Sequence, residues 1–277
     1  MRTPTLAIAY AIALASTAQN GNVPQREEVT FITDNRRLPD AAWQSELRHR
    51  ANWRAFVAAH GTWYAAFNEH NAKPHRAFGS PIATTGSTPQ ERAEQFIATQ
   101  LSGFGIPADE LQLMSVAPTT KYTYVHYKQH HAGMEVLFSR LMVKMDNSGR
   151  VVTFGADVYD AIVVDAMPTL SIADAPIIAS TGLTGVTSTT VESELRILPL
   201  PTARSTEFHL VYETLVHTMN NGMPGHYRCY VDAHDGRLLY RTNLVRAHAP
   251  HGATLAPPPS ADLTLSANVY EFHPFIP

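Results

Sequence analysis

The sequence predicts an α+β fold made of two subdomains, each with a helix packed on an antiparallel sheet. One helix has a clearly marked start, because Thr88, Pro89 and Glu91 form a capping sequence ahead of apolar residues at helical spacing. A run of strand-like segments separated by turns then follows without intervening helices. Helix first and strands afterwards is typical of an α+β fold rather than of alternating βα units. A shorter helix and a second run of strands repeat this order.

The first half of the chain contains two predicted helices and several predicted strands. One helix is expected at residues 41–60, with Asp40 as its N-cap and Gly61 at its end. The capped helix extends from Thr88 to Gly103. Strands are expected at residues 63–68, 122–127, 134–145 and 150–154, with turns at 130–133 and 146–149.

The second half should hold a helix at residues 175–181, which Pro176 is expected to make weak or short by removing a backbone donor. Strands are expected at residues 195–200, 208–217, 226–231 and 237–240. The only cysteine, Cys229, cannot form an intramolecular disulfide. On a strand it shares a face with Tyr227 and Val231, so we expect a buried structural thiol.

Composition excludes some functions and favours export. The 277 residues are 44% hydrophobic and carry a net charge of −3, which argues against a nucleic-acid-binding protein. Residues 1–18 resemble a signal peptide, with an apolar run at 6–15 and small residues at 16–18. The run is too short to span a bilayer. We therefore expect a secreted or otherwise extracytoplasmic protein without a membrane span.

No motif for catalysis or metal binding is present. The His-Glu-x-x-His pattern of zinc peptidases is absent, although there are 14 histidines. His209, Glu213 and His217 would share a face of a helix, but their segment is rich in β-branched and aromatic residues and predicts a strand. Residues four apart on a strand lie roughly 13 Å apart, too far to bind one ion. We expect no catalytic residue, no metal and no cofactor.

Three motifs occur in the order found in one family of pro-regions. The sequence reads Tyr-Val-His-Tyr at 124–127, Gly-Met-Glu-Val-Leu-Phe at 133–138 and Gly-Arg-Val-Val at 149–152. This stretch resembles the fungalysin/thermolysin propeptide domain. Residues 230–240 look like the closing hairpin of a PepSY domain, and residues 63–79 resemble the leading segment of such pro-regions. The residues that carry the resemblance are Pro74, Arg76, Gly79, His126, Gly133, Val136, Gly149, Arg150, Asp232 and Gly236.

The resemblance implies a domain order and a function. An N-terminal pro-segment (19–84) would precede a propeptide-like domain (85–162), a PepSY-like domain (168–246) and a Pro-rich linker and tail (247–277). Such a region assists the folding of a cognate secreted zinc metalloendopeptidase and blocks its cleft. The alternative is a stand-alone exported peptide-binding module, or a protease inhibitor acting in trans. In the tail, Val269, Tyr270 and Phe272 could contact the cleft as an edge strand, or the tail could be an extended spacer.

Overall fold

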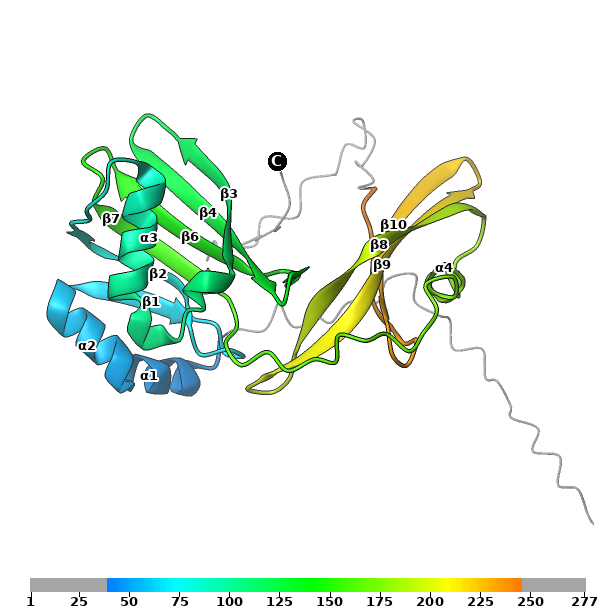
Figure 1. Ribbon diagram of the computed structural model, residues 1–277, viewed down its shortest axis with the longest axis horizontal. Helices are drawn as coiled ribbons and strands as arrows, with labels where there is room; N and C mark the ends of the chain where they lie inside the picture. The colour runs from blue at the N-terminus through cyan, green and yellow to red at the C-terminus, as the bar shows by residue number, and fades with distance from the viewer. Residues whose placement is uncertain (1–38, 246–277) are drawn as a thin grey trace, which may run out of the picture.

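The computed structural model describes residues 39–245. These residues form two antiparallel sheets and four α-helices, which confirms the predicted α+β class (Figure 1). The predicted signal peptide (1–18) and the tail with Val269, Tyr270 and Phe272 lie outside the described residues. Within 39–245, no helix has both the length and the apolar character needed to cross a membrane.

The first sheet has seven strands in the order β1-β2-β7-β6-β4-β3, with β5 paired to β4. Its strands are β1 (Trp63–Phe67), β2 (Pro74–Ile82), β3 (Leu111–Pro118), β4 (Tyr122–His131), β5 (Met134–Glu135), β6 (Arg140–Asp146) and β7 (Val151–Asp157). Strands β1 and β2 come from the predicted pro-segment, yet β2 pairs with β7. The sheet is therefore continuous across residue 85.

The predicted helix at residues 41–60 is two helices, α1 (Ala41–His49) and α2 (Ala51–His60). Between them Arg50 has extended backbone angles, φ −61° and ψ 148°. The break lets each helix bury its own apolar residues, Trp43 and Leu47 from α1 and Trp53 and Phe56 from α2. One continuous helix would not align these residues in a single stripe, which explains the imperfect apolar spacing of the sequence.

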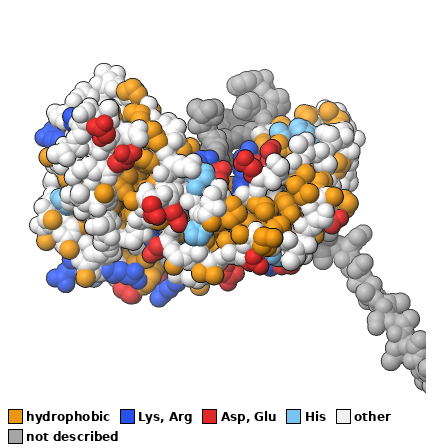
Figure 2. All heavy atoms as spheres, in the orientation of Figure 1, with side chains coloured by type: hydrophobic (Ala, Val, Ile, Leu, Met, Phe, Trp, Pro, Cys, Tyr) orange, Lys and Arg blue, Asp and Glu red, His pale blue; other side chains and the backbone are white. Residues whose placement is uncertain are grey.

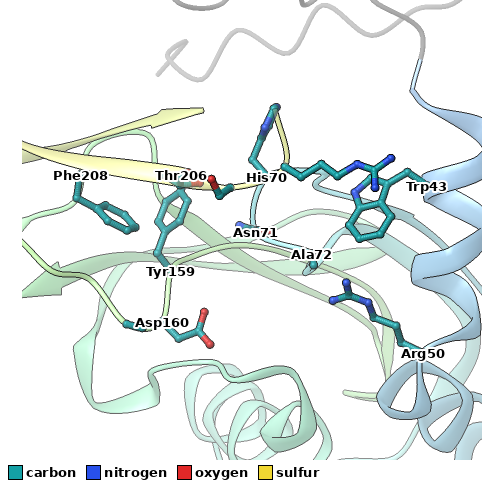
Figure 3. A pocket seen from close by; sticks show the side chains of 12 residues that line it. Trp43, Arg50, His70, Asn71, Ala72, Tyr159, Asp160, Thr206 and Phe208 are labelled. Carbon is teal, nitrogen blue, oxygen red and sulfur yellow. The ribbon is translucent and has the colours of Figure 1, made fainter. Parts of the chain in front are cut away.

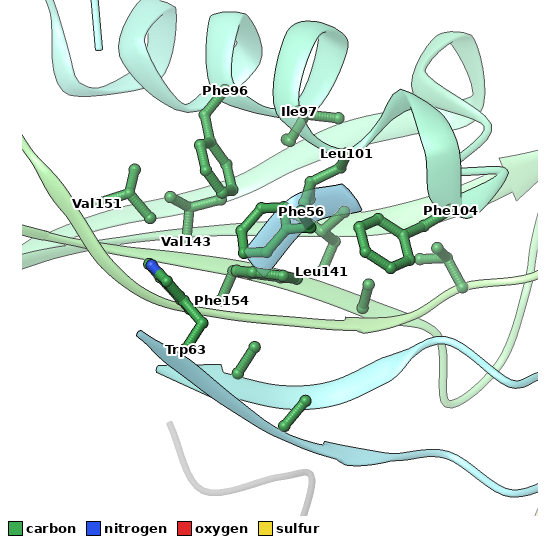
Figure 4. Packing of buried hydrophobic residues seen from close by; sticks show 14 of the residues in the cluster. Phe56, Trp63, Phe96, Ile97, Leu101, Phe104, Leu141, Val143, Val151 and Phe154 are labelled. Atoms are coloured by element: carbon green, nitrogen blue, oxygen red, sulfur yellow. The ribbon is translucent and has the colours of Figure 1, made fainter. Parts of the chain in front are cut away.

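Helix α3 (Pro89–Gln100) covers the centre of the first sheet and confirms the capped helix. The Thr88 side chain accepts from the Glu91 amide, and the Glu91 carboxylate accepts from the Thr88 amide. On its inner face, Phe96 and Ile97 pack over Leu141 and Phe154 (Figure 4). This core, which also includes residues of α2 and β1, fixes the helix side of the sheet.

Two features of the first sheet differ from the predictions. Strand β3 was not predicted, and the expected long strand at 134–145 is interrupted at residues 136–139. There the chain leaves the first sheet and contacts the second, where the Leu137 amide donates to the Ile197 carbonyl at 2.8 Å. Phe138, with a positive φ of 59°, packs edge-on against Tyr230 and Tyr240. Residues 136–139 therefore join the two sheets.

The second sheet is a meander of four strands in the order β11-β10-β9-β8. The strands are β8 (Val186–Pro201), β9 (Thr206–Asn220), β10 (Met223–Asp232) and β11 (Leu238–Asn243). Helix α4 (Ala175–Ser180) packs on one face. Pro176 lies in the first turn of α4, where amides have no helical acceptor, so no helical hydrogen bond is lost there, but the helix is short, with 6 residues, as expected. Cys229 is buried beneath α4, as predicted, and burial raises the pKa of its thiol to about 12.

Candidate protein-binding surface

Three of the four glycines that carry the family resemblance occupy turns. Gly133, Gly149 and Gly236 have φ values of +82°, +76° and +74°, in the region that favours glycine. Next to one of these turns, Arg150 forms an ion pair with Asp146 at 2.7 Å. These residues shape hairpins and do not face a common site.

The upstream residues of the resemblance lie on or near the first sheet. Pro74 and Arg76 belong to β2, and Gly79 lies opposite Trp63, so close that a Cβ at Gly79 would be 2.5 Å from the Trp63 ring. Val136 is fully buried and forms a bridge to Ile197 of the second sheet. These positions favour a structural role for the four residues, in packing and in the course of the backbone, over a role in catalysis or ligand binding.

Asp232 organises the turn between β10 and β11. Its carboxylate accepts from the His209 ring at 2.7 Å and from the amides of His234 and Asp235. Burial alone would raise its pKa, but these hydrogen bonds outweigh burial and hold the pKa of Asp232 below its usual range. The ten resemblance residues are thus spread over both sheets and are not brought together.

The three residues that come nearest to a metal-binding pattern in the sequence do not share a site, because each contacts a different partner. His209, Glu213 and His217 lie on strand β9, as predicted. His209 binds Asp232, and the His217 ring stacks on His226 with centroids 4.1 Å apart. Within residues 39–245, no group of three or more His, Cys, Asp or Glu side chains is arranged to hold a metal ion.

Glu213 forms the centre of a charged cluster on the face of the second sheet opposite α4. It is 5% exposed and pairs with Arg196 and with Arg228, the latter at 2.9 Å. Arg196 also lies 3.7 Å from Glu135, which binds Lys128 of the first sheet at 2.6 Å. Ion pairs of this cluster therefore connect the two sheets, next to the contact made by residues 136–139.

The face of the first sheet opposite its helices carries cations and aromatic rings. The Lys144 ammonium lies 3.8 Å from the centre of the Tyr122 ring and 5.4 Å from that of Tyr124. Beside them, Tyr124 stacks on His126, which lies against Arg140. We call this surface the open face, because among the described residues no helix covers it. Cations over aromatic rings can hold acidic and apolar groups of a protein partner.

Strand β3 forms an exposed and uncharged edge beside the open face, with one irregularity in its pairing between Leu113 and Ser115. All its residues except Leu111 are exposed, including Leu113, Met114 and Val116, and none of its eight residues is charged. Sheet edges of stable monomers usually carry charges or are covered, because a bare edge pairs with other chains. The alternating start of this strand, Leu-Gln-Leu between Pro107 and Pro118, was the signal in the sequence that could have identified it.

The edges at β1 and β8 are protected. At the opposite end of the first sheet, the Gln44 amide pairs with both the amide and the carbonyl of Phe67 on β1. In the second sheet, β8 carries Glu192 and Glu194 at an irregular stretch of its pairing. Strand β3 has neither a charged residue, as β8 has, nor a side chain bonded to its outer backbone among the described residues, as β1 has.

The first sheet with α1 to α3 forms one unit, and the second sheet with α4 forms the other. A second apolar area lies on this second unit. Figure 2 shows hydrophobic side chains gathered on the right-hand unit, below the gap between the two units. The large exposed hydrophobic residues of the linker and α4 are Val163, Met167, Ile172 and Ile177. Exposed apolar areas of this kind mark surfaces that contact other proteins. The edge at β3, the open face and this apolar area are together typical of a surface that binds another protein.

Comparison with known proteins adds little to this picture. The described chain is an α+β protein with two antiparallel sheets. No protein-family model matches it, and no curated protein does. Among solved structures, the Bacillus megaterium YpeB C-terminal domain is similar, with a TM-score of 0.33 and 14% identity over 75% of this chain and 98% of that chain. A similarity this low carries no argument about function.

Proposed function

We propose that this chain is the pro-region of a secreted zinc metalloendopeptidase, which it helps to fold and keeps inactive. The class of partner comes from the resemblance of residues 60–245 to pro-regions of that type. The mode of contact comes from β3, whose uncharged and exposed edge is the observation that carries the proposal.

An exposed edge strand can bind a protease in the way that an extended substrate does. Backbone amides and carbonyls of β3 would pair with an extended segment of the peptidase, and the side chains of Leu113 and Val116 would contact its neighbouring surface. If both proteins belong to one precursor, the contact is intramolecular and a modest affinity suffices. Binding that favours the folded peptidase also assists its folding.

The open face supports the same contact. It begins on β4, the neighbour of β3, so a strand added to β3 would extend the sheet beside Tyr124 and His126. Lys144 and Arg140 lie on β6, two strands further in, so they would meet acidic groups only on a part of the partner that extends over the open face. Such charges give selectivity among partners more than affinity.

The test is a titration of the purified chain, from Gln19 onward, against its cognate mature metallopeptidase. We expect inhibition, and a higher yield of active enzyme when the denatured peptidase refolds in its presence. A serine protease should be little affected. No inhibition together with no gain in refolding would reject the proposal.

Paired variants test the role of β3. In the double variant Leu113→Lys and Val116→Lys, two charges are placed on the exposed edge, and inhibition should weaken at least tenfold. The control is the double variant Ala55→Lys and Ala59→Lys, which adds two charges at exposed positions of α2 away from β3, and it should inhibit like the unchanged chain. Equal loss in both variants would show a general effect of added charge and not a contact through β3.

A further inference from the structure

A pocket separate from β3 lies where the two units meet. It has a volume of about 400 Å³ and opens to solvent. Its walls come from α1 and Arg50, the turn between β1 and β2, the chain after β7, and the β8–β9 turn (Figure 3). These segments are far apart in the sequence, so no pattern of spacing predicts the pocket.

One wall of the pocket carries two guanidinium groups on the same aromatic ring. Arg50 lies 5.1 Å and Arg204 4.6 Å from the centre of the Trp43 ring. Arg204 is 61% exposed, and its nearest carboxylate among the described residues, Asp40, is 3.9 Å away. For Arg50, the described residues provide no carboxylate within ion-pair distance. A guanidinium group placed over an aromatic ring can still direct its N–H donors to an anion.

The opposite wall has a different character. Tyr159 and Phe208 pack edge to face with centroids 5.4 Å apart and give an apolar surface. Beside them the Asp160 carboxylate pairs with the buried Lys73 ammonium at 2.5 Å, while Asp160 itself stays exposed. The Thr206 hydroxyl is buried at the pocket and has no hydrogen-bond partner within residues 39–245. Buried hydroxyls usually have a partner, so a rotation of this side chain that turns the hydroxyl into the pocket would provide a donor for a ligand.

We infer that this pocket binds a glutamate or aspartate side chain of a peptide. The carboxylate would lie against the exposed Arg204, with the charge of Arg50 on the same ring adding to the attraction, its methylene groups against the apolar wall, and a peptide N–H could donate to Asp160. The Asp160 carboxylate disfavours a dianion such as phosphate, whereas a single carboxylate leaves the local charge balanced. The inference stands on the pocket alone and does not rest on the proposed function.

Binding here would also hold the two units together. The His70 ring already bonds to the Thr202 carbonyl at 2.7 Å, which links the β1–β2 turn to the β8–β9 turn. A ligand contacting both Arg204 and Asp160 would add a further link between the same units, beside those made by residues 136–139 and by Arg204 over Trp43. We therefore expect the linker between β7 and α4 to be cut more slowly by an added protease when the peptide is bound.

The test is a nuclear magnetic resonance titration of the purified chain with acetyl-Ala-Glu-Ala-amide. The chain has three tryptophans, and only Trp43 lines the pocket. We expect a saturable shift of the Trp43 indole N–H signal and none for Trp53 or Trp63. The peptide with Gln in place of Glu should bind at least tenfold more weakly, and inorganic phosphate at matched ionic strength should cause no comparable shift.

Three variants check the assignment. Arg204→Gln should weaken binding of the Glu peptide about tenfold without loss of stability, because Arg204 is exposed. Thr206→Val should weaken it severalfold, since only a ligand uses that hydroxyl. Arg237→Gln changes an exposed arginine outside the pocket and should change nothing. Equal binding of the Glu and Gln peptides, equal binding of phosphate, or no effect of Arg204→Gln would each overturn the inference.

Discussion

The His126 ring accepts a hydrogen bond from Arg140 on the open face, with Nδ1 and Nη2 3.0 Å apart. An arginine only donates, so this contact requires a neutral histidine. Burial of the ring, and then the charge of Arg140, lower the pKa of His126 to about 4. In the unfolded chain the same ring titrates near its ordinary value of 6.5.

The chain should therefore lose stability in mild acid. Above pH 6.5 the ring is neutral in both states and contributes no pH dependence. Between pH 6.5 and 4 the unfolded state binds a proton that the folded state does not, so the free energy of unfolding falls as pH falls. We expect a loss of about 2 kcal/mol from this residue, less than the full shift would give because the ring is partly exposed. Urea unfolding at pH 7.5 and 4.5 should show a smaller fall in His126→Gln than in the unchanged chain.

His75 should show the opposite sign. Its hydrogen bond to Asp157, at 2.7 Å, is the main cause that raises the pKa of His75, against the effect of burial. This stabilisation is complete below pH 6.5 and is lost as pH rises through the folded-state pKa. His75→Gln should therefore lower stability at pH 5.5 more than at pH 8.5 in the same urea assay. A larger effect at pH 8.5 would contradict the role of Asp157.

The charged cluster around Glu213 should be important for stability. Glu213→Gln keeps the shape of the side chain but leaves Arg196 and Arg228 without their shared carboxylate. We expect a loss of about 2 kcal/mol, since the glutamate is buried while both arginines are partly exposed. Asp235→Asn, which changes an exposed pair with Arg237, should cost less than about 0.5 kcal/mol. Similar losses in the two variants would show that burial of Glu213 does not matter.

Two glycines of the family resemblance should differ in their tolerance of alanine. At Gly133 a Cβ meets no atom within 4 Å, so Gly133→Ala costs only the positive φ, about 1 kcal/mol. At Gly79 a Cβ would lie 2.4 Å from the Thr62 carbonyl oxygen and 2.5 Å from the Trp63 ring. Gly79→Ala should therefore cost more, about 3 kcal/mol, because backbone or a buried ring must move. Thermal unfolding of both variants measures the difference.

Local signals in the sequence predicted much of the fold. The cap at Thr88, the turn glycines and the alternation of β4 and β9 act within a few residues, so they can be recognised without the structure. The break at Arg50 and the departure of residues 136–139 from the first sheet arise from contacts with distant segments. Strand β3 was missed because both its faces are exposed and its polar alternation is weak.

The candidate surfaces were less predictable than the fold. The resemblance identified residues that shape turns and packing, and it gave no sign of the edge at β3. The pocket at Trp43 depends on Arg50 and Arg204, which are separated by 154 positions of the sequence. No periodicity connects such residues, since their proximity follows from how the two sheets pack.

Arg241 caps the end of α4 from beneath. It is 1% exposed, and its Nη1 donates to the Ala179 carbonyl at 3.1 Å and to the Thr181 carbonyl at 2.8 Å. The last carbonyls of a helix have no partner within the helix. In a helix as short as α4 these carbonyls are a large part of the backbone, so the arginine has a strong influence on whether the helix stays on the sheet.

Arg241→Met should therefore destabilise the second sheet and α4 more than the first sheet. The methionine fills similar space but leaves two carbonyls without their donor in a buried place, which should cost about 2–4 kcal/mol. Arg241→Lys should cost less, because one donor and the charge remain. Hydrogen exchange can separate the units: amides of α4 and β11 should lose protection in Arg241→Met while those of α3 and β6 keep it. Equal protection in both units, or a methionine variant as stable as the unchanged chain, would show that Arg241 is not what holds α4 in place.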